Sequence, residues 1–496
     1  MELVLALDAG TTGVRCVAYG PRLEVVASSH RELPQHFPSP GWVEHDARDI
    51  ARLSLETMSE LTQGLLAQGH EIIVVGLTNQ RETTIGFSRA TGELCHRAIV
   101  WQDRRTTDDC ELLRRGARED EIRKTTGLVL DPYFSGTKMK WLLEHTRLAQ
   151  MDEPALATVD SYLVWILTGG VDGGVFRTEA SNASRTMLMD LAGTHWSPEM
   201  SILLGVPTAM LATIIPSASH WGTIAASAVP ELEGVPICGV LGDQQAALFG
   251  QACFQPGMVK ATYGTGAFVL ALAGDVSPPP QPGLISTVAW NLGQFGPTSY
   301  AYEGSAFVAG AAVQWMRDEL GLIDNAEDLE PLAHSVSDSG GVSFVPAFTG
   351  LGSPFWDADA RGSLLGLARG TNRGHIARAV LEAQAFQVRA MTDAFATAGV
   401  ALHEVRADGG MAAMNSLMHL QACASRVRVR RSTSLEATAR GVASLAGLEA
   451  GMWGSLEEIS DLWTSDYDAS PDNDPALEVL YGRWLDSVRR SHAVLS

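Results

Sequence analysis

The chain has 496 residues, of which 46% are hydrophobic and 19% are charged, so it can bury a large core and we expect more than one domain. A formal net charge of -21 and a pI of about 5.0 disfavour nucleic acid or an anionic membrane surface as a partner, so any phosphate-bearing ligand must be bound by local donors. The six cysteines are scattered and form no C-x-x-C pair, which argues against a zinc knuckle or a disulfide framework and fits a reduced cytoplasm.

The first ten residues, MELVLALDAG, carry Glu2 and only a short apolar run, unlike a secretory signal peptide. No uninterrupted apolar stretch reaches the roughly 18 residues that a spanning helix needs. We therefore expect neither export nor a membrane span.

Short runs rich in β-branched residues alternate with longer helical patterns, which predicts an α/β protein. The runs end in turn-forming residues and lie at 3–10, 71–79, 98–101, 235–243, 259–266, 342–348 and 405–410. Residues 375–399 place apolar side chains near helical spacing and predict one long packed helix that ends at Gly399. A polar linker at 467–475 precedes the last segment, where Asp474 can cap a helix that Pro475 opens.

A weak internal echo joins the two halves of the chain. Residues 5–20 (LALDAGTTGVRCVAYG) and 259–274 (VKATYGTGAFVLALAG) both read as strand, Gly-Thr turn and strand. The echo predicts two related domains, although two unrelated hairpins would give the same local pattern.

The two Gly-Thr turns can serve as phosphate loops. Glycines let backbone N–H groups approach an anion, and Thr11, Thr12 and Thr265 can add hydroxyl donors. Asp8, at a strand end beside the first turn, suits an acceptor for water on a hydrated Mg²⁺. None of the four lysines follows a glycine, and the chain has no G-x-G-x-x-G or H-R-D motif, which excludes P-loop and protein-kinase machinery.

The stretch GVLGDQQAALFG at 239–250 interrupts an apolar run with Asp243, Gln244 and Gln245. Local sequence leaves two roles open for Asp243. It can cap a helix that begins at Gln244 or Ala246, or it can present a functional carboxylate at the end of a strand.

Several segments resemble the FGGY carbohydrate kinase family, in particular its members that act on glycerol. They are NQRETTI (79–85), AIVWQDRRT (98–106), TGLVLDPYFSGTKMKWLLEH (126–145), SNASRTML (181–188), GDQQAALFGQ (242–251), FTGLGSPFWD (348–357) and GSLLGLARGTNRGHIARAVLE (362–382), and the likeness extends over about residues 3–450.

The resemblance implies an α/β fold of two actin-like, ribonuclease-H-like domains that flank a catalytic cleft, with ATP and Mg²⁺ on one side and a polyol on the other. The expected units are a polyol-binding domain (1–246), a nucleotide-binding domain (247–450) and a helical tail packed on the second domain (451–496). The implied activity is ATP-dependent phosphorylation of glycerol to sn-glycerol 3-phosphate in glycerol catabolism, by a cytoplasmic dimer or tetramer. A kinase for another small polyol or ketose and a nonenzymatic nucleotide-gated binding protein remain alternatives.

By the same resemblance, Asp243 is the general base, and Arg81, Glu82, Gln244 and Tyr133 bind the polyol hydroxyls against a wall of Trp101 and Phe268. An extended backbone at 79–83 would point Arg81 and Glu82 in opposite directions, so we expect a turn there. A surface Arg–Glu pair and purely structural aromatics are the alternatives. The implied nucleotide-binding set is Thr11, Thr12, Gly13, Arg15, Thr265, Gly266, Gly310, Gln314, Gly410 and Met414, with Asp8 and Asp243 on the metal.

Three departures from the family pattern lie on the nucleotide side. Members that act on glycerol usually carry Gln at the position of Ala9, Ser-Ser at Gly13-Val14 and Asn at Met414. We expect these changes to alter nucleotide affinity or donor preference and to leave acceptor binding intact. The segment TIAASAVPELEGVPICG (223–239) also lacks the Lys and Arg with which some bacterial members bind fructose 1,6-bisphosphate, so we expect no inhibition through it.

Overall fold

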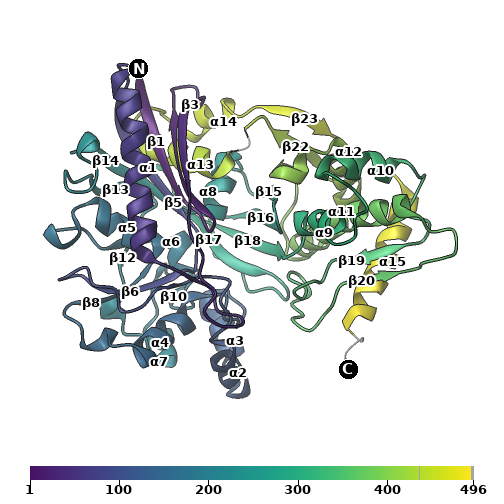
Figure 1. Ribbon diagram of the computed structural model, residues 1–496, viewed down its shortest axis with the longest axis horizontal. Coiled ribbons are helices and arrows are strands. Elements are labelled where there is room, and N and C mark those ends of the chain that lie inside the picture. The colour runs from purple at the N-terminus through teal and green to yellow at the C-terminus, as the bar shows by residue number, and fades with distance from the viewer. Residues whose placement is uncertain (435, 493–496) are drawn as a thin grey trace.

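A computed structural model describes residues 1–434 and 436–492 and contains two large mixed sheets with helices between and around them (Figure 1). The first sheet has the order β13-β14-β5-β1-β2-β3. Its strands are β1 (Glu2–Ala9), β2 (Gly13–Tyr19), β3 (Val25–Glu32), β5 (Glu71–Asn79), β13 (Ala218–Thr223) and β14 (Pro236–Gly242).

The second sheet has the order β17-β18-β16-β15-β21-β22-β23. Its strands are β15 (Met258–Tyr263), β16 (Ala267–Gly274), β17 (Ile285–Asn291), β18 (Thr298–Ala306), β21 (Glu404–Asp408), β22 (Arg428–Ser432) and β23 (Ser465–Ala469).

The two sheets repeat one arrangement. In the first, β1 pairs antiparallel with β2 and parallel with β5. In the second, β15 pairs antiparallel with β16 and parallel with β21. The echo between residues 5–20 and 259–274 therefore reflects equivalent hairpins, and the prediction of two related domains is confirmed.

Two helices, α8 (Asp243–Gly250) and α13 (Ala437–Glu449), lie between the sheets (Figure 1). They share one core with Val4 and Ala6 of β1 and with Leu270 and Leu272 of β16. The helices cross closely, since a Cβ on Gly441 would lie 1.8 Å from the carbonyl oxygen of Ala246. The predicted boundary at 246/247 falls inside α8, and α13 packs on the first sheet although it comes late in the chain.

The remaining helices surround this arrangement, and two of them cover the outer faces of the sheets. Helix α1 packs on the first sheet opposite α13, and α11 packs on the second sheet opposite α8. The first half contains α1 (Ala47–Ala67), α2 (Thr107–Arg115), α3 (Glu119–Thr126), α4 (Ser135–His145), α5 (Val159–Leu167), α6 (Ala180–Ala183) and α7 (Pro198–Leu204). The second half contains α9 (Gly310–Asp318), α10 (Leu329–His334), α11 (Arg373–Thr397), α12 (Asn415–Ser425), α14 (Leu456–Asp461) and α15 (Pro475–His492).

Short strands complete the structure. A four-stranded sheet has the order β4-β7-β6-β8, with β4 (Glu44–His45), β6 (Thr84–Ser88), β7 (Ala98–Ile99) and β8 (Pro154–Thr158). Three two-stranded pairs are β9 (Arg177–Glu179) with β12 (Thr213–Ile215), β10 (Met189–Asp190) with β11 (His195–Trp196), and β19 (Ser343–Val345) with β20 (Ser363–Leu365).

The expected long helix is α11, which ends at Thr397 just before Gly399 in the left-handed region at φ 91°. The last helix also begins as predicted, because Asp474 Oδ1 accepts a hydrogen bond of 2.9 Å from the N–H of Ala476 and Pro475 is the first helical residue. No helix in residues 1–434 and 436–492 combines the length and hydropathy that a membrane crossing requires.

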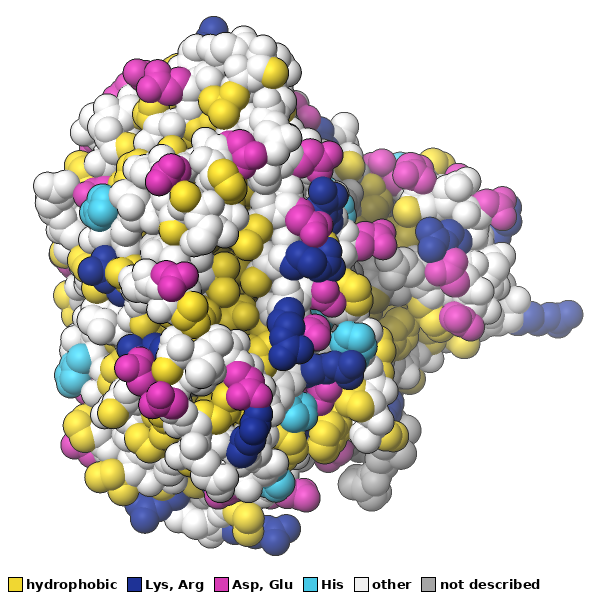
Figure 2. Space-filling model, turned by 60° about the vertical axis from the view of Figure 1, so that its left-hand side comes forward, with side chains coloured by type: hydrophobic (Ala, Val, Ile, Leu, Met, Phe, Trp, Pro, Cys, Tyr) yellow, Lys and Arg dark blue, Asp and Glu magenta, His cyan; other side chains and the backbone are white. Residues whose placement is uncertain are grey.

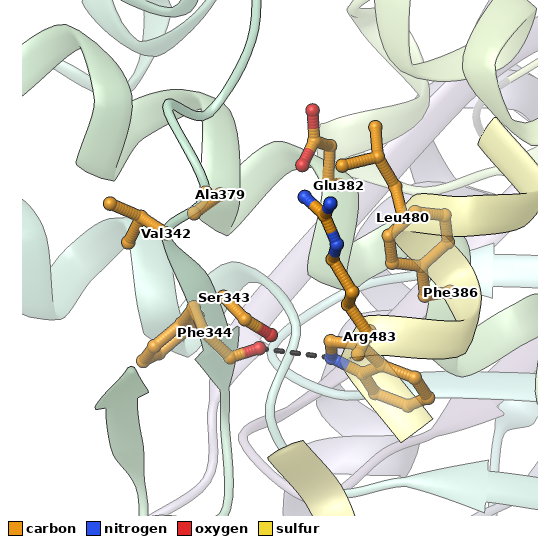
Figure 3. Close-up of a pocket in the computed structure, with 10 residues that line it drawn as sticks. Val342, Ser343, Phe344, Ala379, Glu382, Phe386, Leu480 and Arg483 are labelled. Carbon is orange, nitrogen blue, oxygen red and sulfur yellow. Dashed lines mark hydrogen bonds between the residues drawn. The ribbon is translucent and has the colours of Figure 1, made fainter. Parts of the chain in front are cut away.

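The predicted helical tail (451–496) includes residues 493–496, which lie outside the described residues, and its described part contains the strand β23 (Ser465–Ala469) as well as helices. Strand β23 pairs with β22 and forms an edge of the second sheet, where Asp468 binds Arg428. Helix α15 packs against α11 and the β19–β20 hairpin around a small pocket (Figure 3). There the indole N–H of Trp484 donates to the carbonyl oxygen of Phe344 at 2.9 Å.

Candidate active site

The carboxyl ends of β1, β5 and β14 meet at one edge of the first sheet. Strand pairing sets Asp8 beside Thr78, and Asn79 beside both Ala9 and Gly242. The segments that leave this edge contain the first Gly-Thr turn, the turn at 79–83 and the start of α8. Parallel pairing thus brings together three candidate segments that are far apart in the sequence.

The turn at 79–83 is the one expected from its side chains. Glu82 adopts φ 61°, and the N–H of Thr83 bonds to the carbonyl oxygen of Arg81 at 2.7 Å. This bend turns both Arg81 and Glu82 inward, where each is 2% exposed. The alternative of a surface Arg–Glu pair is therefore wrong.

Arg81 is held by a residue of the second sheet. Its Nη1 and Nη2 donate to the two carboxylate oxygens of Glu303 on β18, at 2.7 and 2.8 Å. Arg185 donates from Nε to Glu82 at 2.6 Å and from Nη2 to Glu303 at 3.3 Å. The sequence interpretation assigned no role to Arg185 or Glu303.

Burial alone would raise the pKa of Glu303, but Arg185 and Arg81 lower it to about 2. Glu303 therefore stays ionised at neutral pH and fixes both guanidinium groups. Two N–H groups in this cluster, Arg81 Nε and Arg185 Nη1, are buried and make no hydrogen bond within the described part of the chain, although Arg81 Nε is ion-paired with Asp243 at 3.2 Å. Buried donors of this kind usually have a hydrogen-bond partner, so these two N–H groups can donate to hydroxyl oxygens of a ligand.

Asp243 is the first residue of α8, and Gly242 is the N-cap. Its Oδ1 lies 3.2 Å from Arg81 Nε and accepts a bond of 2.7 Å from the N–H of Gln244. Its side chain is 30% exposed, in contrast to Arg81. Burial raises the pKa of Asp243, Arg81 opposes that shift, and Glu82 adds to it.

Gly242 has a steric reason to be glycine. A Cβ at this position would lie 2.7 Å from Cγ and Cδ of Arg81. The absence of a side chain thus lets Arg81 lie between β14 and Glu303.

The aromatic residues Trp101 and Tyr133 lie together, with ring centroids 5.6 Å apart in an edge-on arrangement. The indole N–H of Trp101 also donates to Thr11 Oγ1 at 2.9 Å, which links the polyol side to the first Gly-Thr turn. Arg185 lies 5.6 Å from the centre of the Tyr133 ring. Phe268 is half-buried on β16, next to Ser305 of β18, and its role in an apolar wall stays a prediction.

The first predicted phosphate loop is the turn between β1 and β2, closed by the N–H of Gly10 bonding to Gly13 O at 3.0 Å. Thr12 at its tip is exposed, and Thr11 is half-buried. A Cβ on Gly13 would lie 2.8 Å from the carbonyl oxygen of Arg31, so β3 leaves little space for a serine there. Arg15 pairs with Glu436 just before α13.

The second loop, between β15 and β16, meets the start of α9. The N–H of Ala309 donates to Thr265 O at 2.8 Å, and that of Gly310 donates to Gly264 O at 2.9 Å. Gly409, beside Gly410, lies against Tyr263, because a Cβ there would be 2.5 Å from its carbonyl oxygen. Three of the predicted nucleotide segments therefore converge.

The other predicted residues on this side lie next to these turns. Gly266 is buried in the second loop, Gln314 is exposed one turn into α9, and Gly410 is exposed at the start of a short 3₁₀ turn. Met414 directly precedes α12 and packs on the core of the second domain.

Asp8, near the end of β1, has its pKa raised to about 7 by burial and by the nearby Asp243 and Glu436, with Arg15 opposing. A carboxyl group whose pKa is raised by neighbouring carboxylates is suited to binding a cation. Mg²⁺ in phosphoryl-transfer enzymes keeps several waters and binds through one or two carboxylates. Asp8 and Asp243 fit that requirement.

Family models match both halves of this two-sheet structure. Residues 3–250 match the N-terminal domain of the FGGY family of carbohydrate kinases, and residues 259–450 match its C-terminal domain. The chain belongs to the FGGY family of carbohydrate kinases. It is therefore a phosphotransferase with the two-domain fold of that family, as the sequence motifs predicted.

Relatives of this FGGY kinase match over nearly the whole chain. The glycerol kinase of Alkalilimnicola ehrlichii is 49% identical over 94% of both chains, and that of Myxococcus xanthus is 46% identical over 99% of both. Among solved structures, Plasmodium falciparum glycerol kinase with ADP has a TM-score of 0.93 at 32% identity, covering 99% of this chain and 98% of its own. Lactobacillus acidophilus xylulose kinase, at 21% identity and a TM-score of 0.88, covers 100% of this chain and 99% of its own and shares the fold.

Proposed function

We propose that this protein transfers the γ-phosphoryl group of ATP to a terminal hydroxyl of glycerol and gives sn-glycerol 3-phosphate, as a step of glycerol catabolism. The observation that carries the proposal is the cluster of Arg81, Arg185, Glu82 and Glu303 beside Asp243, with two buried N–H groups left to donate. The relatives named as glycerol kinases support the choice of acceptor.

In this proposal the acceptor lies beside both the cluster and Asp243, which are themselves in contact through Arg81. Arg81 Nε and Arg185 Nη1 donate to hydroxyl oxygens, and Glu82 accepts from a hydroxyl. Glu303 makes no contact with the acceptor and holds both guanidinium groups in place. Tyr133 adds a hydroxyl, and Trp101 and Phe268 cover the carbon backbone.

Asp243 acts as the general base for the hydroxyl that attacks. It lies next to the donor cluster, and its partial exposure leaves it hydrated enough to ionise. A base of this kind contributes about 10²- to 10⁴-fold to the rate, and alignment of the two substrates contributes more. Phosphoryl transfer asks little else of the protein in covalent terms.

ATP is the donor that the family uses, and we propose that the two Gly-Thr turns bind its phosphates. Thr11, Thr12, Gly13 and Arg15 form the first part of this site, and Thr265 with Gly266 the second. Gly310, Gln314, Gly410 and Met414 line the rest of the nucleotide site. When bound, Mg²⁺ held by Asp8 and Asp243 through water would neutralise charge on the phosphates.

Charge and composition support a free-standing enzyme of the cytoplasm. On the face shown in Figure 2, basic and acidic side chains are interspersed and form no continuous basic surface. We propose a cytoplasmic homo-oligomer, a dimer or tetramer, whose partners are glycerol and ATP and which binds neither nucleic acid nor membrane.

The nearest alternative is a kinase for a different small polyol or a ketose, because kinases for other acceptors share this fold. A nonenzymatic nucleotide-gated switch is less well supported, since it would need no base beside a hydroxyl-binding cluster. The test is to incubate the purified protein with ATP and Mg²⁺ and a panel of polyols and sugars, and to measure ADP and identify each product. If none of the acceptors in the panel leads to release of ADP, the nonenzymatic switch would be favoured.

A further inference from the structure

Lys260 is a buried cation for which the proposed mechanism has no role. It lies on β15 between Met258 and Thr262 and is 0% exposed. Strand alternation directs Met258 and Lys260 to the same face of the sheet, and Met258 belongs to the core shared with α8. The side chain of Lys260 therefore points from the second sheet toward the helix that begins with Asp243.

Lys260 Nζ donates to the side-chain oxygen Oε1 of Gln244, at 2.5 Å. Its neighbour in the register is Arg406 on β21, whose Nη1 donates to the backbone oxygens of Gln251 and Ala252 just after α8, the latter at 3.2 Å. Two adjacent strands thus each contribute one cation that contacts α8, Lys260 at its first turn and Arg406 at the residues that follow its last turn.

The bond from Lys260 fixes which end of the Gln244 amide is available. An ammonium group can only donate, so the amide must turn its oxygen toward Lys260. The amide NH₂ group is then directed elsewhere, and Gln244 is half-buried beside Asp243. Held in this way, Gln244 can only donate hydrogen bonds to a hydroxyl of the phosphoryl acceptor, because its own oxygen is already bonded to Lys260.

Charge also keeps Lys260 in this position. Burial lowers the pKa of Lys260, but Asp408, Asp243 and Glu303 all favour its charged form, and Arg81 opposes it. Lys260 comes from the second sheet, whereas Arg81 comes from the first, so Asp243 is faced by a cation from each domain.

We propose that Lys260 is a positioning residue that orients the amide of Gln244 so that its NH₂ group donates to a hydroxyl oxygen of the acceptor. This inference rests on the proposed function, because it assumes that an acceptor hydroxyl binds beside Asp243. Lys260 itself does not contact the substrate. It acts through Gln244 and ties the first turn of α8 to the second domain.

A double-mutant cycle on steady-state kinetics tests this directly, using the acceptor that gives the best turnover in the panel. Lys260→Met should raise the KM for the acceptor about three- to tenfold, the size expected for losing one neutral hydrogen bond from the Gln244 amide to the acceptor, with a smaller effect on the KM for ATP. In a Gln244→Ala background the same change should have almost no effect on the acceptor KM, because there is no amide left to orient. Additive effects of the two substitutions would overturn the proposal.

Arg406→Met is the matched control, since it removes the buried cation at the other end of the same helix. Its effect on the acceptor KM should add to that of Gln244→Ala, even if it lowers thermal stability as much as Lys260→Met does. Lys260→Arg serves if Lys260→Met fails to fold. It keeps a charged donor, so an acceptor KM within about threefold of the parent supports the proposal, and a large increase in a well-folded Lys260→Arg protein contradicts it.

The two proposals fail in different ways. If glycerol is not phosphorylated but another acceptor is, the choice of glycerol is wrong and the cycle is run with that other acceptor. If glycerol is phosphorylated and the cycle is additive, only the role of Lys260 is wrong.

Discussion

Arg81 and Glu303 lie 222 residues apart in the chain, yet they are joined by two hydrogen bonds of 2.7 and 2.8 Å. Arg81 follows β5 of the first sheet, and Glu303 lies on β18 of the second. The acceptor site that we propose is therefore built by both domains, and its geometry depends on how they pack around α8.

Replacing Asp243 tests the proposed base. Asp243→Asn should lower kcat by several orders of magnitude and weaken ATP binding far less, because the substitution removes the base and one carboxylate near the metal but keeps the phosphate loops and Asp8. Calorimetric titration with ATP alongside steady-state kinetics measures both quantities. A kcat close to that of the parent would remove Asp243 from the mechanism.

Replacing Arg81 should act on the acceptor. Arg81→Ala should raise the KM for glycerol about 10- to 100-fold, because it removes charged donors from the hydroxyls, and should weaken discrimination against acceptors that lack one hydroxyl. Arg81→Lys keeps the charge but cannot donate to both oxygens of Glu303, so it should recover little of the loss. The KM for ATP is the internal control, and an equal increase in both KM values would contradict an acceptor role.

The pKa of Asp8 predicts a pH-dependent effect on stability. The pKa of Asp8 is raised to about 7 from an ordinary value of 3.8. Between these two pH values the folded state binds more protons than the unfolded state, so stability is lost as the pH rises. Asp8→Asn should therefore increase the free energy of unfolding more at pH 8 than at pH 5, by about 1–3 kcal/mol, while activity falls. Urea unfolding at both values measures this, and an equal effect at the two would show that Asp8 is not so perturbed.

Met414, where members that act on glycerol usually carry Asn, should affect only the binding of the nucleotide. Met414→Asn restores the residue usual in members that act on glycerol and should change the KM for ATP, or the preference between ATP and GTP, without changing the KM for glycerol. Gly13→Ser is a poor companion variant, because a Cβ there would lie 2.8 Å from Arg31 O. A change in the glycerol KM alone would place Met414 outside the nucleotide site.

Fructose 1,6-bisphosphate should not inhibit through residues 223–239. In the structure Glu231 accepts hydrogen bonds from Gln63 and Ser59 of α1, at 2.6 and 3.0 Å, so this acidic turn is fastened to the first domain. A bisphosphate needs several cationic or amide donors, and carboxylates repel it. Initial rates at fixed glycerol and ATP should stay constant as the bisphosphate is added. Saturable inhibition at sub-millimolar bisphosphate would refute this prediction if substitutions within residues 225–236 abolish that inhibition.

Local sequence predicted the parts of the fold that depend on local signals. The paired Gly-Thr hairpins, the helix that ends before Gly399 and the start of the last helix at Pro475 all have such signals, and the structure contains each of them. The strand β23 was missed because SDYDA is short and polar, and it forms only by pairing with the arginines of β22.

The site was predictable only where motifs marked it. Residues 79–83 were expected to turn, but nothing near Glu303 indicates that its partner lies 222 residues away. The signal that could have found Glu303 and Lys260 is a lone charge in a buried strand, TSYAYEGSA for one and MVKATY for the other. A buried charge requires partners, and the sequence does not say which ones they are.

The choice of acceptor is tested most directly by kcat/KM for glycerol and for a five-carbon ketose, measured side by side with ATP and Mg²⁺ and with the phosphorylated product identified. The account predicts efficient turnover of glycerol, sn-glycerol 3-phosphate as its product, and a much lower kcat/KM for the ketose. Efficient turnover of the ketose with none of glycerol would contradict it.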